Sequence, residues 1–156
     1  MAVSKKLKQF LDEKQVNYEE MQHATAYTAQ EIAGAQHVPG QEAVKSVIVK
    51  SNGSFTMCVL PAVRMVDLEK FKAATDVSDA ELAAEEDLAQ LFPDYELGAE
   101  PPFGNLYGLK VVADTSLDDN DSVVFNAGTH TDTIRLTLED FKQLSEAQMA
   151  DIGKPI

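Results

Sequence analysis

The sequence predicts an α+β fold, with a mixed sheet and flanking helices in one compact domain over residues 1–156. Three observations support this class. Apolar residues recur at helical spacing in several segments, and strand-type segments rich in Val, Ile and Phe lie between them. The two kinds of segment are intermixed without the regular alternation of a βαβ fold. At 156 residues, the chain is long enough to bury a core without metals or disulfides.

The first segments predict a helix, an extended stretch and a second helix. An amphipathic helix is expected at the start, because four apolar residues share one helical face: Val3, Leu7, Phe10 and Leu11. An extended segment over residues 17–21 follows. The second helix begins in YTAQEI, where Thr28 and Glu31 form a capping box. It ends before Pro39 and Gly40, which cannot continue a helix.

A β-hairpin is predicted where VKSVIVK and FTMCVL flank SNGS. Asn52 and Gly53 suit a two-residue type I′ turn, and this turn fixes the strand register. The expected facing pairs are Lys50 with Phe55, Ile48 with Met57, Val47 with Cys58, and Lys45 with Leu60. Directly opposed residues share a sheet face. One face therefore carries a mostly apolar set: Lys45, Val47, Val49, Thr56, Cys58 and Leu60.

The second half of the chain is expected to hold short helices and three further strands. Asp67 can cap a helix that runs through Phe71. SDAELAAEEDLAQLF predicts a helix, with a strand around Leu82 as the alternative. The strand candidates are LKVVAD, SVVFNA and DTIRL. A last helix follows, with a capping box formed by Thr137 and Asp140.

Composition and charge exclude several classes of protein. Cys58 is the only cysteine, which rules out an internal disulfide and a multi-cysteine zinc site and suits a reducing cytoplasm. We expect no membrane association, because neither a membrane-spanning apolar run nor a secretory signal is present. The acidic run DTSLDDNDS lacks the glycine and distal glutamate of an EF-hand loop, so no metal is expected. The net charge of −13 opposes general polyanion binding, so we expect no DNA partner.

The sequence pattern alone makes two residues, Lys45 and His130, candidates for catalysis or ligand binding. Lys45 lies on an apolar strand face, where burial lowers the pKa of a lysine unless an anion compensates. The alternative is that its amine reaches water at the strand end. His130 lies in the loop NAGTHTDTI, where Gly128 permits a sharp turn, and it can exchange a proton or donate a hydrogen bond. A surface turn histidine is the alternative there. Cys58 lacks positive neighbours and is expected to be a small core residue.

The segment GAEPPFG predicts a stiff loop of defined shape. Pro101 and Pro102 have a fixed φ and no N–H, whereas Gly98 and Gly104 can adopt conformations closed to other residues. Such a loop either links two elements or forms one wall of a binding site.

Taken in order, these segments resemble the YbaK/ProX family, free-standing relatives of the editing (insertion) domain of prolyl-tRNA synthetases. The resemblance covers nearly the whole chain and rests on HATAYTAQEIA, VKSVIVK, GAEPPFG and VVFNAGTHTDTIRL. It implies a mixed, mostly antiparallel, barrel-like sheet flanked by helices. It also implies a trans-acting, cytoplasmic aminoacyl-tRNA deacylase without a cofactor, which hydrolyses the ester of a mischarged tRNA. The implied partners are the acceptor end of that tRNA and an aminoacyl-tRNA synthetase.

The resemblance also assigns roles to residues. It implies four catalytic residues: Lys45, Gly98, Pro101 and His130. The lysine would contact the terminal nucleotide, and the backbone of residues 98–101 would position the aminoacyl group. The expected substrate-binding residues are Tyr27, Met57, Cys58, Ala99, Glu100, Phe103 and Gly128.

Two other functions remain open at this point. One is a non-catalytic module that binds an aminoacyl group or a synthetase. The other is a hydrolase for a different small activated ester or amide. The sequence leaves the edited amino acid, the tRNA and the oligomeric state open.

Overall fold

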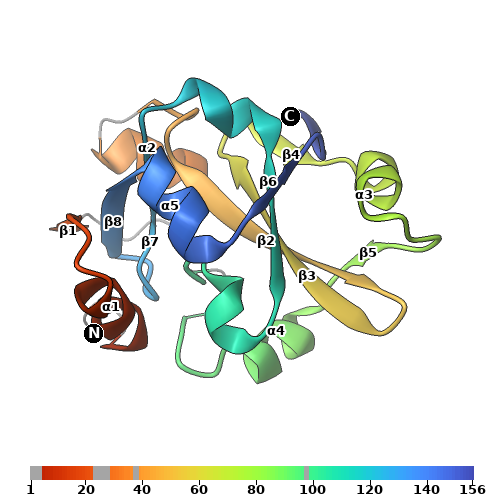
Figure 1. Ribbon diagram of the computed structural model, residues 1–156, viewed down its shortest axis with the longest axis horizontal. Coiled ribbons are helices and arrows are strands. Elements are labelled where there is room, and N and C mark those ends of the chain that lie inside the picture. The colour runs from red at the N-terminus through yellow and green to blue at the C-terminus, as the bar shows by residue number, and fades with distance from the viewer. Residues whose placement is uncertain (1–4, 23–28, 37–38, 97–98) are drawn as a thin grey trace.

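The computed structural model describes residues 5–22, 29–36, 39–96 and 99–156 (Figure 1). The helices are α1 (Lys5–Glu13), α2 (Ala29–Gln36), α3 (Leu68–Thr75), α4 (Glu85–Leu91) and α5 (Leu138–Ser145), with the 3-10 helices η1 (Gly104–Tyr107) and η2 (Thr115–Asp119). The strands are β1 (Glu19–Gln22), β2 (Val44–Ser51), β3 (Ser54–Pro61), β4 (Arg64–Val66), β5 (Glu81–Leu82), β6 (Lys110–Asp114), β7 (Ser122–Asn126), β8 (Asp132–Thr137), β9 (Gln148–Ala150) and β10 (Gly153–Pro155). Among the described residues, no helix is both long and apolar enough to cross a membrane.

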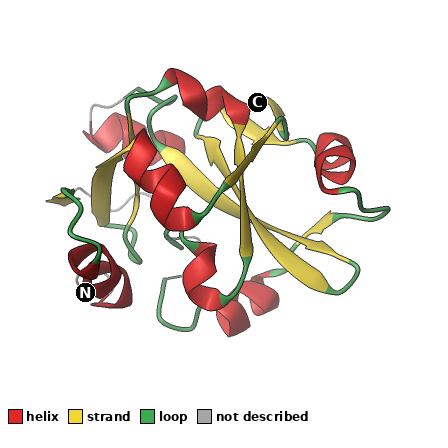
Figure 2. Cartoon of the chain, in the orientation of Figure 1, coloured by secondary structure: helices red, strands yellow, loops and turns green. Residues whose placement is uncertain are grey.

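The strands form a mixed set of sheets, as predicted for an α+β fold. A five-stranded sheet has the order β5-β2-β3-β6-β9, and its β3–β6 and β6–β9 pairs are parallel. The three-stranded sheet β1-β8-β7 and the ribbon β10-β4 are antiparallel. A parallel bridge from Ala43 to Val124 connects the start of β2 to β7. Figure 2 shows the helices distributed around these strands.

The predicted hairpin is confirmed residue by residue. β2 and β3 pair with Lys45 opposite Leu60, and the other three predicted pairs are also found. Asn52 and Gly53 have φ values of 49° and 79°, the positive angles that a type I′ turn requires. The long hairpin runs diagonally across the molecule in Figure 1. The strand face on which Lys45 lies is therefore the one that the sequence predicts.

Local capping explains where the shorter helices begin. The Asp67 carboxylate accepts hydrogen bonds from the backbone N–H groups of Glu69 and Lys70 at the start of α3. At the start of α5, the Thr137 hydroxyl accepts from the Asp140 N–H at 3.1 Å. α2 ends before Pro39 as expected, whereas the predicted capping residue Thr28 lies outside the described residues.

The helix predicted over residues 78–92 is wrong in its first half, where the alternative prediction of a strand around Leu82 is confirmed. Glu81 and Leu82 form strand β5 instead, with Leu82 opposite Val49 at the edge of the central sheet. The Ala83 N–H donates to the Ile48 carbonyl at 2.9 Å. This sheet-edge pairing outweighs the helix propensity of the segment, so α4 begins only at Glu85.

Two buried clusters lie on opposite faces of the hairpin. The first holds Met57, Phe103 and Phe125 together with residues of α1 and α5. The second is smaller and holds Val49, Cys58, Leu60, Phe71, Val66, Val112 and Ile152. A third contact, of Ala33 in α2 with Ala43 and Ala62, places α2 over the start of β2.

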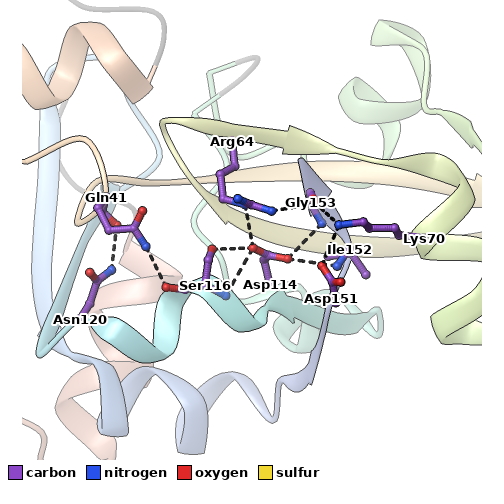
Figure 3. A network of polar contacts seen from close by, with 9 residues as sticks. All are labelled: Gln41, Arg64, Lys70, Asp114, Ser116, Asn120, Asp151, Ile152 and Gly153. Carbon is purple, nitrogen blue, oxygen red and sulfur yellow. Dashed lines mark hydrogen bonds and ion pairs between the residues drawn. The ribbon is translucent and has the colours of Figure 1, made fainter. Parts of the chain in front are cut away.

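The C-terminal strand is held by a buried carboxylate (Figure 3). One oxygen of Asp114 accepts from the backbone N–H groups of Ile152 and Gly153, both at 3.0 Å. The other accepts from the Ser116 hydroxyl at 2.5 Å and lies 3.1 Å from Nε of Arg64. Asp114 is 1% exposed. Burial alone would raise the pKa of this carboxyl group, but the hydrogen bonds and the guanidinium lower it below 3.8.

Candidate active site

Lys45 is a half-buried lysine on β2. Its side chain shares a sheet face with Val49, Cys58 and Leu60, which are all fully buried. Burial lowers the pKa of the Lys45 amine. Within the described parts of the chain, no carboxylate forms an ion pair with it. This lysine therefore offers a cation that a ligand anion can neutralise.

The structure joins the proline loop directly to the glycine-histidine loop. Gly128 has a φ of 103°, so its left-handed backbone makes the sharp turn that the sequence predicts. Its N–H donates to the Ala99 carbonyl at 3.2 Å, and its carbonyl accepts from the Glu96 N–H at 2.9 Å. Two segments about 30 residues apart in sequence thus form one unit.

His130 is held through its backbone. The residue is 9% exposed, and its N–H donates to the Glu96 carboxylate at 2.6 Å. Behind it, the Thr129 hydroxyl donates to Asp132 at 2.6 Å and accepts from the Asp132 N–H at 3.1 Å. Both of these residues are almost fully buried. These bonds order the loop, so the position of His130 is set by its neighbours rather than by solvent.

The proline loop is buried rather than open. Ala99, Glu100 and Pro101 are all buried, whereas Gly98 lies outside the described residues. The Pro101 carbonyl accepts from the Phe103 N–H at 2.8 Å, and the Ala99 carbonyl accepts from Gly128. Each of these carbonyl oxygens has a second lone pair that the backbone hydrogen bond does not occupy.

Three predicted substrate-binding residues belong to the core. The Phe103 ring is 1% exposed and makes edge-to-face contacts with Phe10, Phe125 and Phe141. Met57 is fully buried in the same cluster. Cys58 is fully buried on the opposite face, where burial raises the pKa of its thiol to about 12.

The buried positions of Met57 and Cys58 correct the prediction that both residues contact the substrate. Because successive residues of a strand point to opposite faces, Met57 and Cys58 cannot line the same pocket. Tyr27, the remaining candidate, lies outside the described residues.

The sequence reasoning missed three residues beside these loops. Glu96 binds the His130 backbone, Asp132 orders the loop, and Asn126 ends β7 just before the loop begins. A local signal existed only for Asp132, whose spacing from Thr129 allows a hydroxyl-carboxylate turn. Glu96 contacts a residue 34 positions away, and no local pattern predicts such a contact.

A separate cavity of about 510 Å³ lies at the far end of the hairpin. Its lining includes Phe55, Phe71, Thr75, Lys110 and Gln148, but none of the predicted site residues. Among the described residues, no group of three or more His, Cys, Asp or Glu side chains could hold a metal ion.

Fold comparisons place the molecule in a known structural class. It resembles a crystal structure of a proposed trans-editing enzyme for prolyl-tRNA synthetase, with a TM-score of 0.84, 22% identity, and coverage of 97% of this chain and 96% of the other. A crystal structure of a hypothetical protein gives a TM-score of 0.87 at 20% identity, with coverage of 96% and 100%. At these identities the likeness shows the shared fold.

Sequence comparison identifies the family. The model for the aminoacyl-tRNA editing domain matches residues 23–144, and the chain belongs to this family. A proline–tRNA ligase of Staphylococcus saprophyticus is 32% identical over 104 residues, which are 65% of this chain and 18% of the ligase. The chain thus spans less than a fifth of that relative's length.

Proposed function

We propose that this protein is a trans-acting deacylase that hydrolyses the ester between a wrongly attached amino acid and its tRNA. The observation that carries the proposal is the direct hydrogen bonding between the proline loop and the loop of His130, in a chain of the editing-domain family. Lys45 supplies the cation of the proposed site.

The reaction makes modest demands on the protein. Water attacks the ester carbonyl, a tetrahedral oxyanion forms, and the C–O bond to the ribose breaks while the proton from water passes to the ribose oxygen. An aminoacyl ester is already activated, so placement of the reactants and stabilisation of the oxyanion supply most of the catalysis. The buried Cys58 thiol is held neutral and is not required as a nucleophile.

The proposed roles follow from the environment of each residue. The Lys45 ammonium binds a phosphate of the terminal nucleotide, because a half-buried cation that has no carboxylate partner among the described residues gains most from an anion. The free lone pairs on the Ala99 and Pro101 carbonyls suit the α-ammonium of the amino acid. His130 is held at a fixed place, from which it donates a hydrogen bond to the reacting ester.

The proposal is tested with a panel of tRNAs mischarged with alanine, serine, threonine or cysteine. We expect the wild type to release one amino acid rapidly and Lys45→Ala to lose that activity. Lys50→Ala is the matched control, because Lys50 lies on the same strand but on the opposite sheet face. We expect the control to retain wild-type activity.

The alternatives give different results in the same assay. A non-catalytic binding module would bind the charged tRNA without releasing the amino acid, and Lys45→Ala would then lower affinity alone. A hydrolase for other small esters would act equally well on an aminoacyl ester that lacks the tRNA. Either result would contradict the deacylase proposal.

A further inference from the structure

The side chain of Asn126 has an unfulfilled hydrogen-bonding capacity. This residue ends β7, immediately before the loop that carries His130. The residue is partly exposed, but its amide oxygen is buried and has no hydrogen-bond partner in the described parts of the chain. Leaving a buried acceptor unpaired is costly, and a water, an ion or a ligand donor can supply the missing contact. The amide oxygen is therefore a candidate contact for a ligand donor.

Asn126 points to the sheet face opposite the main core. Phe125, which directly precedes Asn126, and Val123, two residues earlier, belong to the first buried cluster. Because side chains alternate along a strand, Val124 and Asn126 point to the other face. The unpaired Asn126 amide therefore lies on the face of β7 opposite the first buried cluster.

Lys45 and Asn126 both follow the parallel bridge that connects the start of β2 to β7. The parallel bridge pairs Ala43 with Val124, and the Val124 N–H donates to the Glu42 carbonyl at 3.0 Å. Lys45 and Asn126 are each two residues beyond the bridge along their own strands, so the alternation of side chains puts them on the same faces as Ala43 and Val124, respectively. The bridge is isolated, so the described strands β2 and β7 are not closed by further pairing at this level. A ligand placed there meets a cation from one strand and an amide acceptor from the other.

Lys45 and Asn126 together indicate which chemical groups a ligand needs. The lysine requires an anion, and the amide oxygen requires a donor. Lys45 repels a cationic donor such as an α-ammonium, whereas it does not repel a neutral hydroxyl. The terminal nucleotide of an aminoacyl-tRNA carries both a phosphate and one free ribose hydroxyl, which neighbours the ester.

We infer that the Asn126 amide oxygen accepts a hydrogen bond from the free ribose hydroxyl next to the scissile ester, while Lys45 binds the adjoining phosphate. This inference rests on the proposed function and adds a substrate contact to it. The hydroxyl keeps its proton, and no bond to Asn126 is formed or broken. The contact fixes the orientation of the ribose, and with it the face of the ester that water can reach.

The test measures binding, so it does not depend on turnover. The probes are two RNA hairpins with a tRNA acceptor stem, each carrying alanine on the terminal 3′ position through an amide. One hairpin has a 2′-hydroxyl on its terminal ribose, and the other has hydrogen there. We expect Asn126→Ala to weaken binding of the hydroxyl probe by roughly 3- to 10-fold, the value of one hydrogen bond, and to leave binding of the hydrogen probe unchanged.

Two variants separate this role from a structural one. Asn126→Asp retains an acceptor oxygen and should keep the preference for the hydroxyl probe. Asn105 also has a buried amide oxygen without a partner, but it lies in η1 and donates to the Leu144 carbonyl of α5. Asn105→Ala should therefore preserve the preference between the two probes.

The outcomes distinguish this inference from the deacylase proposal. An equal loss of affinity for both probes in Asn126→Ala, or a wild type that binds both equally, would overturn the role of Asn126. A hydroxyl preference that disappears in Asn126→Ala, in a protein that releases no amino acid from any tRNA, would support the contact and contradict the deacylase proposal.

Discussion

A half-buried lysine without an ion-pair partner is a costly residue unless it binds something. Burial lowers the pKa of Lys45, which means that the fold disfavours its charged form. Between the lowered pKa and the ordinary value of 10.5, the unfolded chain binds more protons than the folded one. The cost to stability is therefore fully present below the lowered pKa, and it is relieved as the pH rises toward 10.5. A functional role accounts for keeping such a residue.

This cost predicts opposite effects on stability and activity at one position. Lys45→Met keeps the length of the side chain but removes the charge, so the thermal unfolding midpoint at neutral pH should rise. Deacylation should fall by roughly 10-fold or more, because a charged hydrogen bond to phosphate is lost. Calorimetry and the deacylation rate measure the two effects. Lys50→Met should change neither, and a fall in the stability of Lys45→Met would show that Lys45 is structural.

At the scale of elements, the contact between the two loops positions His130. The Glu96 carboxylate accepts from the His130 N–H at 2.6 Å, a charge-assisted bond on a partly exposed residue. Glu96→Gln keeps the shape but removes the charge, so we expect deacylation to fall by about 5-fold with little change in stability. The fall should appear in kcat rather than KM, since the loop is misplaced but the phosphate contact remains.

A matched control is available two residues upstream. Asp94 is exposed and lies 3.4 Å from the Tyr107 hydroxyl, so Asp94→Asn should leave kcat unchanged. An equal loss of thermal stability and activity in Glu96→Gln would instead assign Glu96 a purely structural role.

The hydrogen bonds from Ile152 and Gly153 to Asp114, which we call the clamp on β10, predict a pH-dependent contribution to stability. The carboxylate of Asp114 binds the backbone of Ile152 and Gly153, and its pKa is lowered. Its contribution to stability is therefore present above about pH 4 and is lost as the pH falls through the lowered pKa. Asp114→Asn should destabilise the protein by about 3 kcal/mol at neutral pH, because it leaves Arg64 and two N–H groups without the anion.

Urea unfolding of Asp114→Asn at several pH values measures this effect. The variant should lose less stability than the wild type between neutral pH and pH 3. Asp118→Asn is the control, since its partner Lys142 is also partly exposed and such pairs contribute about 0.5 kcal/mol or less. Parallel pH profiles for Asp114→Asn and the wild type would contradict the clamp.

Elements defined by neighbouring residues were predictable, and those defined by distant contacts were not. The turn at Asn52 and Gly53 fixed the whole β2–β3 register and hence the face of Lys45. β5 arises because Leu82 pairs with the edge of β2, and the clamp on β10 depends on a carboxylate 38 residues away. Glu96 carries no local signal for the same reason, because its contact with His130 arises only when the two loops come together. The contact proposed for Asn126 likewise depends on β2 and β7 meeting at the bridge.

For the whole molecule, the proposed function requires a chain with a net charge of −13 to bind RNA. Among the described residues, six lysine and arginine side chains form ion pairs with carboxylates, which reduces the positive charge available to a polyanion. A long electrostatic footprint on a tRNA is therefore disfavoured. The proposed site offers one cation, Lys45, so few phosphates should be neutralised on binding.

The salt dependence of binding measures that number. Each phosphate contact adds about −0.7 to −0.9 to the slope of log affinity against log salt, so a contact through Lys45 and one further cation predicts a slope no steeper than about −2. Lys45→Ala should make the slope shallower by about 1, whereas Lys50→Ala should leave it unchanged. The measurement is a titration of the amide-linked acceptor hairpin over a range of potassium chloride concentrations. A slope steeper than about −4 that is unaffected by Lys45→Ala would require an extended cationic surface. The exposed lysines of α1 (Lys5, Lys6 and Lys8) would then be the residues to replace next.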